Sequence, residues 1–322
     1  MKISLRRIVP VLLLAVFVMG LFVVGRDVGR TRAALAHFEP LAFVTGCALA
    51  FANYLLRFVK WEFYLARLGV RGVPKLESLL VFFSGFVLTV TPGKVGEVFK
   101  SVVLEERRGV PVARTGPIVL AERLTDVVGI VVLIALGTLG FSGGGLWAVL
   151  GTAAVVVGLA VVSSDRAMEF GFVAVGRTRF SALVPKLRVA YESLRVLVAP
   201  SALLVPSVVS VVAWFLECIA VWEILRGFGV DASVALCTFF YATSTLIGAL
   251  VPVPGGLGIT EGLLQEQMVR LGGIELGTAT AAMILVRLAT LWFAVLVGFV
   301  AYGLLGLSKP PSRSGASHDA AA

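Results

Sequence analysis

The sequence has few charged residues, cysteines and histidines. Only 15% of its 322 residues are charged, against about 25% in typical soluble domains. Its three cysteines (Cys47, Cys218 and Cys237) lie inside apolar runs, at spacings that fit neither a disulfide framework nor a zinc site. His37 and His318 are isolated, and no GxxxxGK[ST] phosphate loop occurs. These absences argue against a disulfide-rich domain, a metal or haem protein, and ATP hydrolysis by this chain, so we expect no metal and no cofactor.

Apolar residues dominate instead. They make up 58% of the chain, and the mean hydropathy is +0.99. They gather in runs of the roughly 20 residues that cross a bilayer as a helix. The net charge of +9 is confined to short segments between these runs, as expected for loops that contact anionic headgroups. The composition therefore predicts an all-α, polytopic membrane helix bundle and no nucleic-acid partner.

The apolar runs predict six full spans and two interrupted stretches. The spans cover about residues 8–25, 41–66, 115–140, 146–163, 201–225 and 278–305, and the interrupted stretches are 77–104 and 234–271. The first run could also belong to a signal peptide. It is long for one and no A-x-A site follows it directly, so we favour a retained span.

Lysine and arginine in the loops indicate the orientation. The basic segments after the second span, around 105–114 and within 164–200 are all cytoplasmic if 77–104 enters and leaves on the same side. We then expect both termini in the cytoplasm of a cell (inner) membrane protein. The 26–40 segment fits least well, because the scheme places its three arginines outside.

The domain scheme has two parts. Residues 1–307 form one membrane domain, and residues 308–322 look disordered. Within 164–200, the stretch KLRVAYESLRVLV has near-helical apolar spacing. It predicts an amphipathic helix on the membrane surface, with an ordinary solvated connector as the alternative.

A duplicated motif interrupts the two broken stretches. Residues 92–96 read PGKVG and residues 254–258 read PGGLG, and an acid follows each, Glu97 and Glu261. A Trp-Glu pair precedes the two prolines by 31 and 32 residues, and an Arg-Leu pair follows them by 31 and 33. This order predicts two repeats, at about 41–140 and 201–305, joined by 141–200.

The orientation scheme makes these repeats antiparallel. Such inverted repeats are common in secondary transporters, which bind substrate near the repeat interface. Proline removes a backbone donor and glycine permits a tight reversal, so each motif predicts a re-entrant helical hairpin. A plain surface turn is the alternative. The predicted turn residues are Pro92, Gly93, Gly96, Pro254, Gly255, Gly256 and Gly258.

Ionisable residues also lie inside the predicted spans, where they are expensive and usually face a cavity or a partner. Glu122, Arg123 and Asp126 lie about a quarter of the way into the third span, about 12 Å deep at 1.5 Å per residue. We expect Arg123 and Arg287, one per repeat and near opposite membrane faces, to bind a phosphate. Arg123 could equally pair with Asp126 on its own helix or with Glu97. The candidate headgroup ligands are Arg123, Arg287, Glu97, Glu261, Lys94, Glu122, Asp126 and Glu217. Lys94 and Lys100 could instead be snorkelling lysines.

The stretches 91-TPGKVGEVFKSVVL-104, 121-AERLTD-126 and 252-PVPGGLGITEGLL-264 make the chain resemble the lysylphosphatidylglycerol synthase transmembrane family, also called flippase-like or UPF0104. The resemblance covers about residues 40–305. It implies lipid binding or translocation, since this membrane domain is associated with lipid flipping in the bifunctional synthases. Only a short tail follows residue 305, so we expect no aminoacyltransferase domain.

The leading hypothesis from the sequence is a lipid flippase and not an enzyme. Its substrate would be a phospholipid or a polyprenyl-phosphate-linked lipid with an anionic headgroup. A non-transporting scaffold or regulator of a lipid-synthesis enzyme is the alternative. A membrane transferase is a weaker one, because no DxD, HxxxD or Ser/His/Asp set occurs. A homodimer, or a lipid-synthesis enzyme as partner, is left open.

Overall fold

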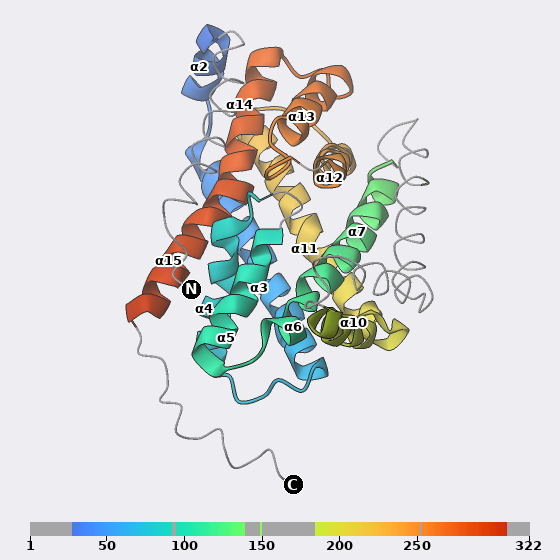
Figure 1. Ribbon diagram of the computed structural model, residues 1–322. Coiled ribbons are helices and arrows are strands. Elements are labelled where there is room, and N and C mark those ends of the chain that lie inside the picture. The colour runs from blue at the N-terminus through green and yellow to red at the C-terminus, as the bar shows by residue number, and fades with distance from the viewer. Residues whose placement is uncertain (1–27, 92–94, 139–148, 150–183, 252, 308–322) are drawn as a thin grey trace, which may run out of the picture.

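The computed structural model describes residues 28–91, 95–138, 149, 184–251 and 253–307 (Figure 1). Within this part the chain forms a bundle of helices, which confirms the expected all-α membrane fold. The predicted spans 8–25 and 146–163 and the tail 308–322 lie outside the described residues, apart from residue 149. So do Pro92, Gly93 and Lys94.

Three continuous helical segments in the described part are long and apolar enough to cross a membrane. They are α3 (Pro40–Arg67), α11 (Pro200–Gly227) and the segment Leu276–Leu307, which consists of α14 (Leu276–Arg287), the π-helical turn η5 (Leu288–Trp292) and α15 (Phe293–Leu307). These helices match the predicted spans 41–66, 201–225 and 278–305. The predicted span 115–140 forms α7 (Pro117–Gly137), which carries three charged residues in its first half.

Helices α3 and α11 pack against each other in opposite directions. Three hydrogen bonds mark this arrangement along their length: Glu39 N–H to the Gly227 carbonyl (2.9 Å), Asn53 Nδ2 to the Ala213 carbonyl (2.7 Å) and Arg67 Nη2 to the Ser201 carbonyl (3.2 Å). The beginning of each helix therefore lies beside the end of the other. Gly46 allows a close approach, since a Cβ there would lie 3.3 Å from Ile224.

Each of these two helices is followed by a helical hairpin. In the first hairpin, α4 (Lys75–Ser84) and the 3-10 turn η1 (Gly85–Leu88) lead to a tip, and η2 (Val95–Val98) and α5 (Phe99–Arg108) return from it. In the second hairpin, α12 (Val234–Leu250) leads to the tip and α13 (Ile259–Arg270) returns. In Figure 1, the first hairpin occupies the lower half of the bundle and the second the upper half.

The two hairpin tips meet inside the bundle. A Cβ on Gly255 would lie 3.4 Å from the Cα of Val90, and Val90 and Leu257 belong to one apolar cluster. The glycines are required by the backbone of the second tip. Gly255, Gly256 and Gly258 have φ values of +61°, +66° and +86°, a region that glycine enters without the steric cost of a Cβ.

The other helices complete the bundle in a reciprocal way. Helix α7 packs on α12 of the second hairpin, and α15 packs on α4 of the first. A short helix that the sequence analysis did not predict, α2 (Val28–Ala36), covers α14. The predicted amphipathic helix is present as α10 (Val184–Val198), which packs on α7 and on α6 (Val112–Thr115).

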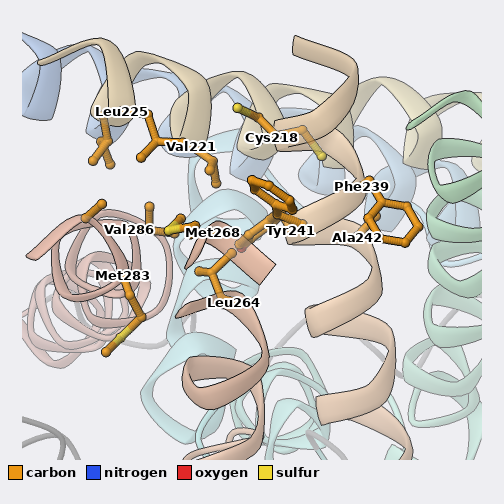
Figure 2. Packing of buried hydrophobic residues seen from close by; sticks show 14 of the residues in the cluster. Cys218, Val221, Leu225, Phe239, Tyr241, Ala242, Leu264, Met268, Met283 and Val286 are labelled. Atoms are coloured by element: carbon orange, nitrogen blue, oxygen red, sulfur yellow. The ribbon is translucent and has the colours of Figure 1, made fainter. Parts of the chain in front are cut away.

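Two large apolar clusters fill the interior. One is built from α3, α4, α5, α7, α10 and α15, and the other mainly from α11 to α14. Figure 2 shows the second cluster, in which Met268, Met283 and Val286 lie together below α11. Cys218 and Cys237 are buried in this cluster as free thiols.

Candidate functional site

A cavity of about 200 Å³ lies where the two tips meet α3, α7, α11 and α14. Apolar side chains form part of its wall, together with backbone of the second tip. Its wall also carries charged and phenolic groups from five helices. These are Tyr54, Arg57, Arg123, Asp126, Glu217, Tyr241 and Arg287. A largely apolar cavity into which a few polar and charged groups converge is a typical place for a ligand.

In the first half, Glu97 joins two arginines of different helices. Its Oε2 lies 3.2 Å from Nη2 of Arg57 and 3.2 Å from Nη2 of Arg123. Arg123 also reaches Asp126 on its own helix at 3.1 Å, so both pairings considered for Arg123 occur. Glu97 is 1% exposed, whereas the side chain of Arg123 is 21% exposed. Arg123 is therefore the accessible cation of this group.

In the second half, the pairing is between Arg287 and Glu261. Nε of Arg287 lies 2.6 Å from Oε1 of Glu261, and its Nη2 donates to the Gly255 carbonyl at 3.1 Å. The other carboxylate oxygen of Glu261 accepts from the Gly258 N–H at 2.7 Å. Glu261 thus caps the beginning of α13.

The two Arg–Glu pairs are equivalent in sequence. Arg123 follows Glu97 by 26 residues, and Arg287 follows Glu261 by 26 residues. Glu97 directly follows its P-G-x-x-G motif, and Glu261 stands three residues after the end of its own. In both halves, the pair fastens the return of a hairpin to the next long helix.

Lys60 is a buried participant that the sequence analysis missed. Its Nζ lies 2.8 Å from Oδ1 of Asp126 and 2.6 Å from the Ser210 hydroxyl, which donates to the same carboxylate at 3.0 Å. The side chain is 1% exposed. A lysine three residues after Arg57 inside a predicted span was the signal that could have identified it.

Lys100 and Glu122 form a separate buried pair. Nζ of Lys100 lies 2.8 and 2.6 Å from the two carboxylate oxygens of Glu122, and each side chain is 2% exposed. The ammonium also lies 4.8 Å from the ring centre of Trp61 and 4.9 Å from that of Phe82. Lys100 is thus not a snorkelling lysine, and Glu122 lies away from the cavity wall.

Two phenols complete the cavity wall. Tyr241 reaches from α12 toward α11 and donates a hydrogen bond to Glu217 (Figure 2). Tyr54 donates to the Thr290 carbonyl at 2.6 Å. Thr290 lies in η5, where the π-helical turn departs from the regular hydrogen-bond pattern; such turns are frequent at functional sites. The sequence carries no signal for this turn that we recognised.

The predicted site residues separate into three groups. Arg123, Asp126, Glu217, Arg287, Gly255 and Gly256 line the cavity. Glu97 and Glu261 hold the arginines from behind. Gly96, Pro254 and Gly258 shape the tips, and a Cβ on Gly96 would lie 2.5 Å from Leu88 and Thr91. Arg123 and Arg287 line the same cavity, and their position relative to the membrane faces stays a prediction.

The described residues contain no group of three His, Cys, Asp or Glu side chains suited to a metal ion. The polar part of the wall contains guanidinium, carboxylate and phenol groups, together with threonines. Guanidinium groups bind phosphate and carboxylate in a bidentate way. The cavity can therefore hold a small anionic or zwitterionic group.

Comparison with known proteins agrees with these features. The chain is 31% identical to a UPF0104 membrane protein of Methanothermobacter thermautotrophicus over 100 residues, which are 31% of this chain and 29% of that protein. It is 23% identical to a UPF0104 membrane protein of Methanocaldococcus jannaschii over 224 residues, 67% of this chain and 93% of that protein. The family model described as the lysylphosphatidylglycerol synthase TM region matches residues 8–298. The chain therefore belongs to this lysylphosphatidylglycerol synthase TM region family of membrane proteins.

Proposed function

We propose that this protein is a lipid flippase, which moves a phospholipid or a polyprenyl-phosphate-linked lipid between leaflets. The observation that carries the proposal is the arginine-lined cavity at the meeting point of the two hairpin tips. The membership in a family named for a lipid synthase supports a lipid substrate. The acyl or prenyl chains would remain in the bilayer while the headgroup occupies the cavity.

The proposed mechanism uses two inverted repeats with re-entrant hairpins. Three observations support it: α3 and α11 run antiparallel, α7 and α15 pack reciprocally on the opposite hairpins, and the Arg–Glu pairs have the same spacing. Rocking of one repeat against the other would expose the cavity to each leaflet in turn. If both termini lie on the cytoplasmic side of the inner membrane, the two hairpins would enter the membrane from opposite sides.

Arg123 and Arg57 are the proposed phosphate ligands of the first half. Both are held by Glu97, so an entering phosphate would compete with this carboxylate for the two guanidinium groups. Arg287 would act in the same way against Glu261. Displacing a glutamate would loosen the hairpin that it fastens, which gives the substrate a direct effect on the hairpin position.

The test is translocation of a fluorescent phosphatidylglycerol in proteoliposomes, followed by quenching from outside. We expect Arg123→Ala and Arg287→Ala each to slow translocation at least about tenfold, the loss of one charge-assisted contact. Arg226→Ala is the control, since Arg226 is a half-exposed surface residue paired with Glu223. Variants that are folded, judged by monodisperse elution, and as fast as the parent would refute the site.

The same experiment tests the alternative functions. A folded parent that binds lipid but does not translocate it would favour a scaffold or regulator of a lipid-synthesis enzyme. Crosslinking in the native membrane would identify a second copy or an enzyme as the partner.

A further inference from the structure

The ion pairs in and behind the cavity, together with Glu217, make up what we call the buried charge network; Lys100–Glu122 and Arg287–Glu261 are separate pairs within it. Its members are Arg57, Lys60, Lys100, Arg123 and Arg287 as cations, and Glu97, Glu122, Asp126, Glu217 and Glu261 as acids. All are buried except Arg123, which is partly exposed. With five cations and five acids among the described residues, this buried charge network is neutral only when every acid is ionised.

Four of the acids lie beside a close cation. Glu97, Glu122, Asp126 and Glu261 each have a lysine or arginine nitrogen within 3.2 Å. Glu217 contributes the fifth negative charge from the cavity wall, 5% exposed, and shares a hydrogen bond with the hydroxyl of Tyr241. A hydroxyl can serve a carboxylate as donor and a carboxylic acid as acceptor, so this contact suits both protonation states of Glu217.

Other ionisable groups also face Glu217 across the cavity. Helix α3 contributes Tyr54 and Arg57, α7 contributes Arg123 and Asp126, α12 contributes Tyr241, and α14 contributes Arg287. Helix α10 directly precedes α11 in the chain, and Glu217 lies about 25 Å along α11 from its first residue at 1.5 Å per residue. On α11 itself, Cys218 and Glu223 are the ionisable residues that follow Glu217 most closely. Glu217 is thus placed where the charge of a bound headgroup acts on it directly.

We propose that binding of a singly anionic headgroup in this cavity is coupled to the uptake of one proton by Glu217. The inference rests on the proposed function. An anion bound to the arginines would leave the network with one excess negative charge in a medium of low dielectric constant, which is unfavourable. A proton that adds to the Glu217 carboxylate restores neutrality, and it leaves again when the headgroup is released.

The coupling gives the protein a source of energy that acts through this chain's own residues. If headgroup and proton enter together and leave together, a proton gradient across the membrane drives the lipid in the same direction. A zwitterionic headgroup adds no net charge, so it would bind without a proton. The cavity would therefore distinguish anionic from zwitterionic lipids by their pH dependence.

Calorimetric titration with dihexanoyl phosphatidylglycerol in two buffers of different ionisation enthalpy tests the proposal, because it counts protons taken up. For the detergent-solubilised parent near neutral pH we expect about one proton per bound lipid, and an affinity that rises about tenfold per unit fall in pH. We expect Glu217→Gln to bind with neither proton uptake nor this pH dependence. Glu223→Gln, on the same helix outside the cavity, should match the parent, and dihexanoyl phosphatidylcholine should bring no proton.

The outcomes separate the two proposals. Binding of phosphatidylglycerol without proton uptake overturns the coupling and leaves the lipid site intact. The same holds if Glu217→Gln takes up as many protons as the parent, or if phosphatidylcholine brings as many as phosphatidylglycerol. Failure of the folded parent to bind either lipid overturns the proposed function, and the coupling with it.

Discussion

Substitution of Lys100 tests how much the buried Lys100–Glu122 pair stabilises the packing of the first hairpin on α7. Lys100→Met leaves the carboxylate of Glu122 buried, with its two hydrogen bonds of 2.8 and 2.6 Å removed. An uncompensated buried charge costs about 3–5 kcal/mol. The variant also loses the cation–π contacts of the ammonium with Trp61 and Phe82, at 4.8 and 4.9 Å, which contribute about 1–2 kcal/mol. We expect the single variant to lose most of its stability.

The double variant Lys100→Met, Glu122→Leu should recover the stability that Lys100→Met loses. Replacing a buried ion pair by apolar side chains of similar volume is often neutral or stabilising, so we expect its free energy of unfolding to lie within about 2 kcal/mol of the parent's. The measurement is reversible unfolding in mixed detergent micelles, followed by tryptophan fluorescence, to which the neighbouring Trp61 contributes.

Two results would contradict this reasoning. A double variant no more stable than Lys100→Met would show that the buried charge is not the cause of the loss. A double variant that is folded and stable but no longer translocates lipid would return Glu122 to the headgroup ligands expected from sequence, although it lies off the cavity wall.

Two further predictions concern the packing of the halves. Gly298→Ala should lower the free energy of unfolding by about 1–3 kcal/mol, because its Cβ would lie 2.6 Å from a backbone nitrogen of η1; Gly303→Ala, in the same helix and facing open space, should cost nothing, and equal losses would refute the explanation. Tyr54→Phe should cost about 1–3 kcal/mol because the Thr290 carbonyl loses its 2.6 Å hydrogen bond inside the bundle; unfolding in mixed micelles measures this loss, and an unchanged midpoint would show that the π-helical turn does not depend on this bond.

The equal spacing of the Arg–Glu pairs relates the sequence motif to a contact in the structure. From sequence, P-G-x-x-G followed by an acid indicates a hairpin, and the arginine further on indicates a buried charge. In the structure each arginine contacts the glutamate of its own motif, at 3.2 Å in the first half and 2.6 Å in the second. The duplicated landmarks thus correspond to a duplicated contact.

Several features could be predicted because they depend on local physics. Hydrophobic length predicts the helices α3, α7, α11 and Leu276–Leu307, since a run of apolar residues must be satisfied as helix in lipid. Proline and glycine predict where α12 and α13 separate, because the backbone needs positive φ there. The depth of Arg123 and Arg287 in apolar runs predicts that each faces a cavity or a partner.

The choice of partners could not be predicted in this way. Lys60 lies 66 residues from Asp126 and 150 from Ser210, yet contacts both. Which of the many buried charges meet depends on the rotation of each helix about its axis and on how deeply the tips enter, and packing between distant segments sets both. For the same reason only the tertiary structure shows that Arg123 and Arg287 line one cavity and that Glu122 lies outside it. The sequence by itself determined that a membrane helix bundle forms and that proline and glycine interrupt two of its apolar stretches.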